Sequence, residues 1–224
     1  KLNINLVFYG ENGELEYAGD PKFKDKPFKP MSEWTNQHFK GSNFDHLLRF
    51  GLKNKNYLSK KDIKNGDIDF YKIPNLSKLK KANIKGKHFF SYYKKWTPQE
   101  NYYYCVDNTG FKPNDERSEG TYSKYSSLDD KMDGFHYYMR YIKFGLGRCS
   151  EETSHEVRDS HITRDEGIRL MNKYEGEFPK KYFKDFLNYL DINEKQFRVV
   201  VDKWRPKHLW KKKNNKWIFT GKIK

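Results

Sequence analysis

The clearest hydrophobic pattern in the chain predicts a helix from about Leu128 to Phe144. Apolar residues recur there at helical spacing and form a stripe that we expect to face the core. Polar residues recur at the same spacing on a second stripe, and their charges need partners because unpaired buried charge is costly. An anionic ligand is one possible partner. The apolar stripe is Leu128, Met132, Phe135, Met139 and Ile142, and the polar stripe is Asp129, Asp133, His136, Arg140 and Lys143.

Three further helices and a hairpin are predicted after this helix. Thr163 and Glu166 have the spacing of a capping box, and Asn193 is a second N-cap. Pro179 is expected in the first turn of the helix between them. The basic segment Leu209–Phe219, with two asparagines in its middle, predicts a hairpin. The inward residues are expected to be Phe183, Phe186, Leu187 and Leu190 in one helix, and Phe197, Val200, Val201 and Trp204 in the next.

The N-terminal part of the chain has a different pattern. Residues 4–9 predict a buried strand, and residues 20–90 read as a loop-rich insertion with short helices. Because the sequence begins almost directly in this strand, we expect an earlier part of the same domain to precede it. Two glycines and three carboxylates follow the strand, where Mg²⁺ or polar substrate groups bind in open α/β sheets. A solvated acidic turn is the alternative.

The net charge of +15 points to a nucleic-acid-binding protein, but its distribution argues against one. Residues 52–95 carry thirteen basic and three acidic side chains, and residues 203–224 carry nine and none. Residues 96–202, in contrast, carry sixteen basic and twenty acidic side chains. Two cysteines build no disulfide framework, which fits a cytoplasmic protein. No apolar run approaches the roughly 18 residues that span a membrane, so no membrane partner is expected.

Arginines cluster in the part of the chain that lacks the excess of positive charge. The chain has 36 lysines and nine arginines, yet six of the nine lie between Arg117 and Arg169. Arginine forks suit phosphate and carboxylate groups, so the cluster predicts anion recognition. Two glycines lie between Lys143 and Arg148, where backbone amides could also approach an anion. The alternatives are a glycine C-cap with surface cations, and ordinary ion pairs on helix surfaces. The histidines and cysteines show no metal-ligand spacing, and no metal site is expected.

Long segments of the chain resemble the C-terminal half of bacterial N-acetyl sugar amidotransferases. These are ATP-pyrophosphatase (PP-loop) enzymes that make acetamidino sugars for lipopolysaccharide and for flagellin glycans, such as those of the pseudaminic acid type. The resemblance covers nearly all of the chain except parts of residues 20–88. The segments that carry it are LVFYGEN (6–12), WTPQENYYYCVDNTGF (96–111), RSEGTYSKYSSLDDKMDGFHYYMRYIKFGLGR (117–148), HEVRDSHITRDEG (155–167), GEFPKKYFKDFLNYLDI (176–192) and HLWKK (208–212).

The resemblance implies a fold that is mainly α with minor β, as the C-terminal part of an α/β PP-loop enzyme. That fold is adenine nucleotide α-hydrolase-like and Rossmann-like. Residues 1–19 would end the PP-loop domain, with a last core strand, and residues 20–90 would be a variable insertion. Residues 91–204 would be a helical region that closes the substrate and nucleotide site, and residues 205–224 a basic tail. The family's Ser-Gly-Gly-x-Asp-Ser loop is absent from the sequence, so we expect these residues alone to be inactive.

The implied reaction is the ATP-dependent conversion of a sugar acetamido group to an acetamidino group through an adenylylated intermediate. ATP and Mg²⁺ would be cofactors, a glutaminase subunit would supply ammonia, and the sugar would be nucleotide-activated or free. No catalytic acid or base is assigned. The residues expected to bind nucleotide or substrate are Glu11, Asn12, Glu16, Lys124, Tyr125, His136, Arg140, Lys143, Gly145, Gly147, Arg148, Arg158 and Arg164.

Two other functions fit parts of the sequence. One is a basic nucleic-acid-binding protein, whose affinity would fall steeply with salt. The other is a non-catalytic docking module whose basic tail holds the glutaminase subunit. The net acidic charge of residues 96–202 tells against the first of these.

Overall fold

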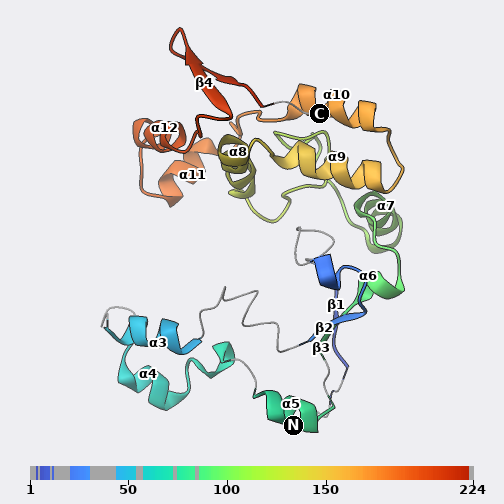
Figure 1. The fold of residues 1–224 in the computed structure, drawn as a ribbon, viewed down its shortest axis with the longest axis vertical. Helices are drawn as coiled ribbons and strands as arrows, with labels where there is room; N and C mark the ends of the chain where they lie inside the picture. Colours follow the sequence, from blue (N-terminus) through green and yellow to red (C-terminus); the bar gives the residue numbers. More distant parts are fainter. Residues whose placement is uncertain are drawn as a thin grey trace. The chain divides into compact units, whose positions relative to one another are not determined.

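The computed structural model describes residues 4, 6–10, 12, 21–30, 44–53, 58–72, 75–83 and 86–221 (Figure 1). The chain divides into two compact units, Lys1–Trp96 and Thr97–Lys224. Among the described residues helices predominate and the sheets are small, which confirms the expectation of a mainly α fold with minor β. The predicted site residues Glu11 and Glu16 lie outside the described residues.

The first unit contains a small sheet and several short helices. The strand order is β1-β3-β2, with β1 parallel to β3 and β2 antiparallel to it. The described elements are β1 (Phe8–Tyr9), a 3₁₀ helix (Pro21–Phe23), β2 (Phe28–Pro30), α3 (Phe44–Lys53), α4 (Lys60–Asn65), a second 3₁₀ helix (Asp69–Tyr71), α5 (Leu76–Lys81), β3 (Gly86–Phe89) and α6 (Phe90–Tyr93).

The strand predicted at residues 4–9 is shorter than predicted, and it is not buried. Among the described residues of this range, only Phe8–Tyr9 are in a strand, and they form an edge of the sheet. Leu6, Val7 and Phe8 are exposed in the structure. An apolar run alone does not distinguish a central strand from an edge strand, because the neighbours that bury it come from elsewhere in the chain.

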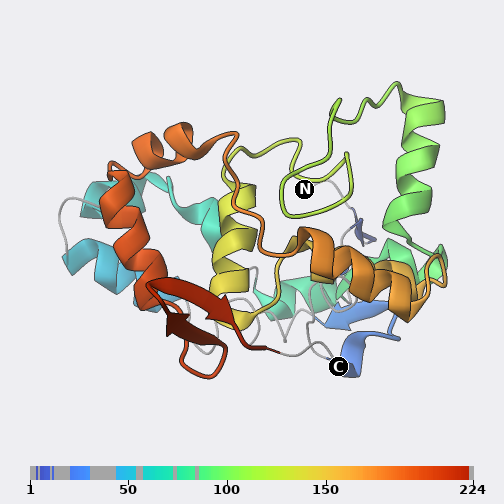
Figure 2. The same cartoon turned by 90° about the horizontal axis from the view of Figure 1, so that it is seen from above.

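The second unit is built from helices and a C-terminal hairpin (Figures 1 and 2). Helices α9 and α10 lie side by side, and Gly167 lets them approach closely, since a Cβ there would lie 3.3 Å from Val157. The elements are α7 (Pro98–Thr109), α8 (Asp133–Phe144), α9 (Arg148–Arg158), α10 (Arg164–Tyr174), α11 (Phe183–Tyr189), α12 (Glu194–Lys203), β4 (Trp210–Lys213) and β5 (Lys216–Phe219).

The apolar stripe of α8 is the centre of the core of this unit. Phe135 and Ile142 are each only 1% exposed. Phe135 stacks on Phe186 of α11, with ring centroids 4.0 Å apart. Phe197 of α12 meets the same ring edge-on at 6.5 Å. The predicted periodicity of Phe135 and Ile142 therefore identified the core-facing side of this helix correctly.

The hairpin closes the core next to α8, and it confirms the strand pairing predicted for Leu209–Phe219. Its strands are antiparallel, with Trp210 opposite Phe219. The buried Trp210 indole Nε1 donates a hydrogen bond of 2.8 Å to the carbonyl oxygen of Ile142. Carbonyls in the last turn of a helix lack intrahelical donors, so the indole satisfies one of them. The hairpin is thereby fixed to the end of α8.

The start of α8 differs from the prediction. The helix begins at Asp133 and not at Leu128, and Leu128 is 40% exposed and outside the core stripe. The Asp130 side chain accepts a hydrogen bond of 2.7 Å from the Met132 amide, and Ser127 has a positive φ of 56°. Short polar side chains that bond to nearby backbone compete with helix formation, so the helix starts after them.

The predicted helix start at Pro179 is also wrong. The helix begins at Phe183, and the preceding backbone is held differently, because the Glu119 carboxylate accepts from the amides of Lys180 and Lys181 at 2.8 and 3.1 Å. Three residues predicted to face inward are exposed: Leu190, Val200 and Trp204.

Local capping signals were more reliable than these boundaries. Thr163 and Glu166 form the predicted capping box at the start of α10. Asn193 caps α12, and the Gln196 side chain completes a capping box there. Both motifs are set by residues three positions apart, so distant packing does not change them.

We predict that Phe135→Ala lowers the free energy of unfolding by about 3–5 kcal/mol, because it removes a buried ring that packs against other aromatic side chains. Urea denaturation measures the change. Val199→Ala is the control: this side chain is 62% exposed, and its removal should cost less than about 0.5 kcal/mol. Equal losses for the two variants would contradict the assignment of the core.

Candidate functional site

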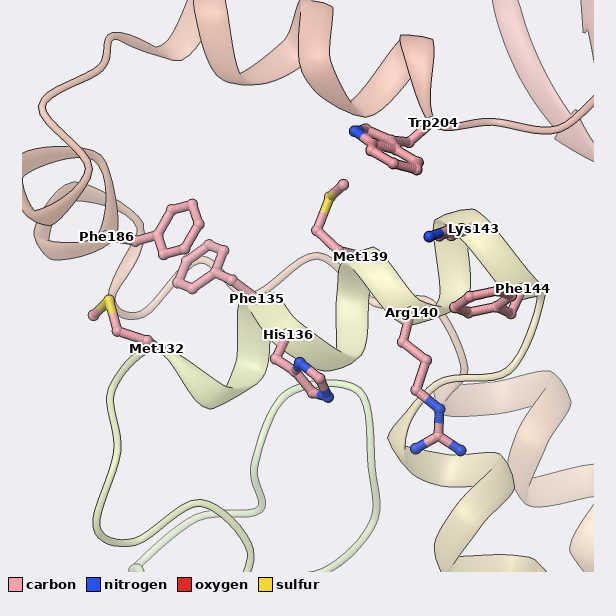
Figure 3. A pocket seen from close by; sticks show the side chains of 9 residues that line it. All are labelled: Met132, Phe135, His136, Met139, Arg140, Lys143, Phe144, Phe186 and Trp204. Atoms are coloured by element: carbon pink, nitrogen blue, oxygen red, sulfur yellow. The ribbon is translucent and has the colours of Figure 1, made fainter. Parts of the chain in front are cut away.

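A groove of about 550 Å³ runs along α8 in the second unit (Figure 3). Its walls are largely apolar and come from α8, α11 and the end of α12. Figure 3 shows Met139 pointing toward Trp204, and His136 and Arg140 leaving the same side of α8. Apolar clefts with a few polar groups are the usual form of small-molecule sites. The lining residues are Met132, Phe135, His136, Met139, Arg140, Lys143, Phe144, Phe186 and Trp204.

Three of the predicted binding residues line this groove together: His136, Arg140 and Lys143. Because the buried face of α8 is fixed by Phe135 and Ile142, helical spacing places the polar stripe beside that face. The Lys143 ammonium lies 4.4 Å from the centre of the Trp204 ring, a cation–π distance. The groove therefore combines cationic groups with an exposed aromatic ring.

Arg140 is held in place by α9. One of its nitrogens, Nη1, forms an ion pair with the Glu151 carboxylate, and the Tyr137 hydroxyl donates to the same carboxylate at 3.2 Å. Both charged side chains are half-buried. A guanidinium has five N–H donors, so this ion pair leaves others for a ligand. The arrangement fixes the arginine without using up its capacity to bind an anion.

Arg148 has a different environment from Arg140. Its side chain is only 17% exposed, and its guanidinium lies 4.2 Å from the Tyr137 ring. Nη1 lies 3.4 Å from Asp133 and Nε lies 3.1 Å from Glu152. These contacts connect α9 to the start of α8. Arg148 therefore holds α9 to the start of α8 and does not line the groove.

The loop that precedes α8 is fastened to α9 by Glu152. Its carboxylate accepts hydrogen bonds from the hydroxyls of Thr121, Ser123 and Ser126, in addition to the contact with Arg148. Buried polar groups need such partners, because an unmade bond to a buried carboxylate is costly. The polar residues of this segment thus hold its conformation.

Two predicted binding residues lie in this loop and serve its structure. Lys124 donates through Nζ to the Asp115 carbonyl oxygen at 2.8 Å. The Tyr125 hydroxyl donates to Gln99 at 3.0 Å, and its ring stacks on Tyr102 at 4.6 Å. Burial raises the pKa of the Tyr125 hydroxyl above its usual value. Neither residue lines the α8 groove.

The predicted anion site at the glycine turn is filled by a carboxylate of the protein itself. Gly145 ends α8 with a φ of 75°, and Gly147 precedes α9. The carboxylate of Glu175, which follows α10, accepts a hydrogen bond from the Ser150 amide at 2.7 Å, and its other oxygen is buried beside Gly147 with no hydrogen-bond partner among the described residues. A Cβ at Gly147 would meet this carboxylate at 2.1 Å. A ligand could therefore approach Gly147 only if Glu175 moved away, and the side chains of Phe219 and Leu209 lie against Gly145.

Three other predicted residues are described, and their contacts lie within their own units. Asn12, in the first unit, is buried and donates to the Ser91 hydroxyl at 3.0 Å. Arg158 ends α9 and contacts His155 Nδ1 at 2.7 Å. Arg164 is exposed in the first turn of α10. Of the eleven predicted residues that the structure describes, three line one groove.

No group of three or more His, Cys, Asp and Glu side chains among the described residues could hold a metal ion. None of the helices described is long and apolar enough to cross a bilayer.

Residues 119–224 match a family model described as "LPS biosynthesis protein WbpG-like, C-terminal domain". The matched range contains α8 through the hairpin, and with them every residue that lines the groove. This range is therefore similar to the C-terminal domain of a family of lipopolysaccharide biosynthesis. Among curated proteins, none matches the chain.

Sequence reasoning missed four residues that shape this site: Glu151, Glu152, Glu175 and Trp204. Glu152 follows Arg148 at the i,i+4 spacing of helical ion pairs, so that contact was readable. Glu175 comes from a distant part of the chain, and no local pattern indicates that it reaches α9. Trp204 has helical spacing on an apolar face and was therefore assigned to the core.

The two cysteines are predicted to differ sharply in reactivity. Burial raises the pKa of the Cys149 thiol to about 12, whereas Cys105 is half-buried. The thiolate is the reactive form, so Cys149 should resist Ellman's reagent in the folded protein. We expect the Cys105 thiol to react fast in the folded protein and the Cys149 thiol to react only in denaturant. Cys105→Ser should remove the fast phase, and a fast phase retained in that variant would contradict the prediction.

Glu175 should make stability depend on pH. Burial is the main cause that raises the pKa of its carboxyl above the ordinary value. Because this pKa is higher in the folded state than in the unfolded state, the protonated carboxyl stabilises the folded protein below the ordinary pKa. This stabilisation is lost as pH rises through the folded-state pKa. We therefore expect wild type to gain stability relative to Glu175→Gln as pH falls from neutral toward 4. Urea denaturation of both proteins across this range measures it, and a pH-independent difference would refute it.

Proposed function

We propose that the chain is part of an ATP-dependent amidotransferase of lipopolysaccharide biosynthesis, located in the cytoplasm. Its reaction converts the acetamido group of a sugar to an acetamidino group. ATP adenylylates the oxygen of the acetamido group with release of diphosphate, and ammonia from a glutaminase subunit then attacks the same carbon and displaces AMP. The resemblance of the sequence to PP-loop N-acetyl sugar amidotransferases supports this finer assignment, and the lipopolysaccharide family match supports its pathway.

The observation that carries the proposal is the composition of the α8 groove. Lys143, Arg140 and His136 offer cationic or ionisable groups, while Trp204 and Phe186 offer flat apolar surface. A ligand that suits both has a ring and an anionic group. A sugar joined to a nucleotide through phosphate has these features, and so does a sugar acid.

The side chains of the groove have distinct parts in the proposed reaction. Arg140 and Lys143 bind the anionic group, and the ion pair with Glu151 keeps the guanidinium in one orientation. Trp204 contacts the ring of the sugar or the base. Holding the sugar in one orientation lowers the entropic part of the activation barrier. No catalytic acid or base is assigned among these residues.

ATP and Mg²⁺ belong to the proposed reaction, but the described residues do not provide a fitting site for them. They include no metal-ligating cluster, and the Glu175 carboxylate already accepts from the Ser150 amide in the first turn of α9. ATP supplies the adenylyl group that activates the acetamido oxygen. We therefore assign only sugar binding to the α8 groove.

We predict that Lys143→Met weakens the binding of UDP-N-acetylglucosamine by about tenfold, which is the loss of one charge-assisted hydrogen bond. Methionine keeps the packing against Trp204 but removes the charge. Isothermal titration calorimetry of the full chain measures the affinity. Lys173→Met, which removes an exposed lysine outside the groove, is the matched control and should bind as wild type does.

Free N-acetylglucosamine is the second ligand in this experiment. Because it has no anionic group, Lys143→Met should leave its weaker binding unchanged. Equal effects of the two lysine variants on the nucleotide sugar, or no binding of it by wild type, would contradict the assignment of the groove.

A further inference from the structure

The C-terminal hairpin has two chemically different faces. Side chains alternate along a strand, and residues paired across an antiparallel ladder share a face. One face carries Trp210, Lys212, Trp217 and Phe219, and its aromatic residues pack on the core. The other face carries only Lys211, Lys213, Lys216 and Ile218, all of them exposed. We call these last four residues the outer face.

The outer face lies in a segment without negative charge. Residues 203–221 contain no Asp or Glu, and no ion pair joins any outer-face lysine to the rest of the described chain. Figure 1 shows the hairpin projecting from the second unit, on the side where α8 and α12 lie. Further exposed basic side chains flank it: Lys203, Lys207, His208 and Lys212.

We propose that the outer face docks this protein on an anionic lipid bilayer. An anionic membrane attracts nearby lysines without requiring a specific geometry, and each lysine raises the affinity for the membrane about fivefold. Ile218, which is 46% exposed among these lysines, can enter the interfacial layer. The sequence predicted no membrane partner because no segment can span a bilayer, but a surface contact needs no span.

Three observations favour a bilayer over a macromolecular partner. Lysine is depleted in protein–protein interfaces, where arginine and aromatic residues dominate, and the outer face has neither. It also offers no arginine fork or stacking ring for a nucleic acid. Finally, lipopolysaccharide is a membrane component, and the family match places residues 119–224 with proteins that contribute to its synthesis.

Vesicle co-sedimentation of the full chain tests the proposal. Vesicles of phosphatidylcholine with about 30% phosphatidylglycerol should bind the chain, and pure phosphatidylcholine should not. Raising the salt from about 50 to about 500 mM should release the protein, because the screening length falls well below 10 Å. The triple variant Lys211→Gln, Lys213→Gln, Lys216→Gln should bind about 100-fold more weakly, from about fivefold per lysine.

The matched control removes the same charge elsewhere. Lys173, Lys184 and Lys195 are exposed on α10, α11 and α12, and their triple change to Gln should leave vesicle binding close to that of wild type. Equal losses in both triple variants would overturn the proposal, as would salt-independent binding or no binding to anionic vesicles. A hairpin variant that loses affinity for duplex DNA but not for vesicles would also overturn it. None of these variants alters the α8 groove, so the result is independent of sugar binding.

Discussion

The burial of one face of α8 is the constraint on which the rest of the second unit depends. Phe135 and Ile142 are almost completely enclosed, and burial of each such side chain contributes about 1.5–3 kcal/mol. Turning the helix about its axis would lose this energy and would bury Arg140 or Lys143 without partners. The orientation of the polar stripe is therefore fixed by the core. The groove exists because α11 and α12 cover the apolar stripe and leave the adjacent side of the helix open.

Helix α9 connects this groove to the loop before α8 through two successive residues. Glu151 binds Arg140 and Tyr137, whereas Glu152 binds the loop hydroxyls and Arg148. Neighbouring residues on a helix point about 100° apart, so one helix can support two separate structures. A displacement of α9 would therefore change the groove and the loop together. The polar side chains of the loop before α8 are therefore bonded to α9, and few of them remain for a ligand.

Sequence reasoning succeeded where the determinant was local and failed where it was distant. The capping boxes of α10 and α12 depend on residues three positions apart, and both were predicted correctly. The periodicity of α8 identified its buried face, but its start was misplaced because Asp130 captures a nearby amide. The role of Glu175 was not readable, since it reaches the start of α9 from the end of α10. Arginine clustering pointed to the region that contains the α8 groove, yet it did not distinguish a residue that lines the groove, such as Arg140, from a residue that does not, such as Arg148.

Charge is distributed unevenly along the chain, so electrostatic attraction differs between the α8 groove and the C-terminal hairpin. Residues 96–202 carry more acidic than basic side chains, so the α8 groove lies in no general positive field. An anion is attracted there only over short distances, by the few donors that the helix presents, and such contacts are specific in geometry. The hairpin, in contrast, carries unopposed lysines on a projecting face, and its attraction extends over about the 10 Å screening length at moderate salt. Because the hairpin is anchored to the end of α8 by the Trp210 hydrogen bond, a surface that binds the lysines would hold the groove at a fixed distance. The same indole that completes the core thus links the position of the α8 groove to the position of the basic face.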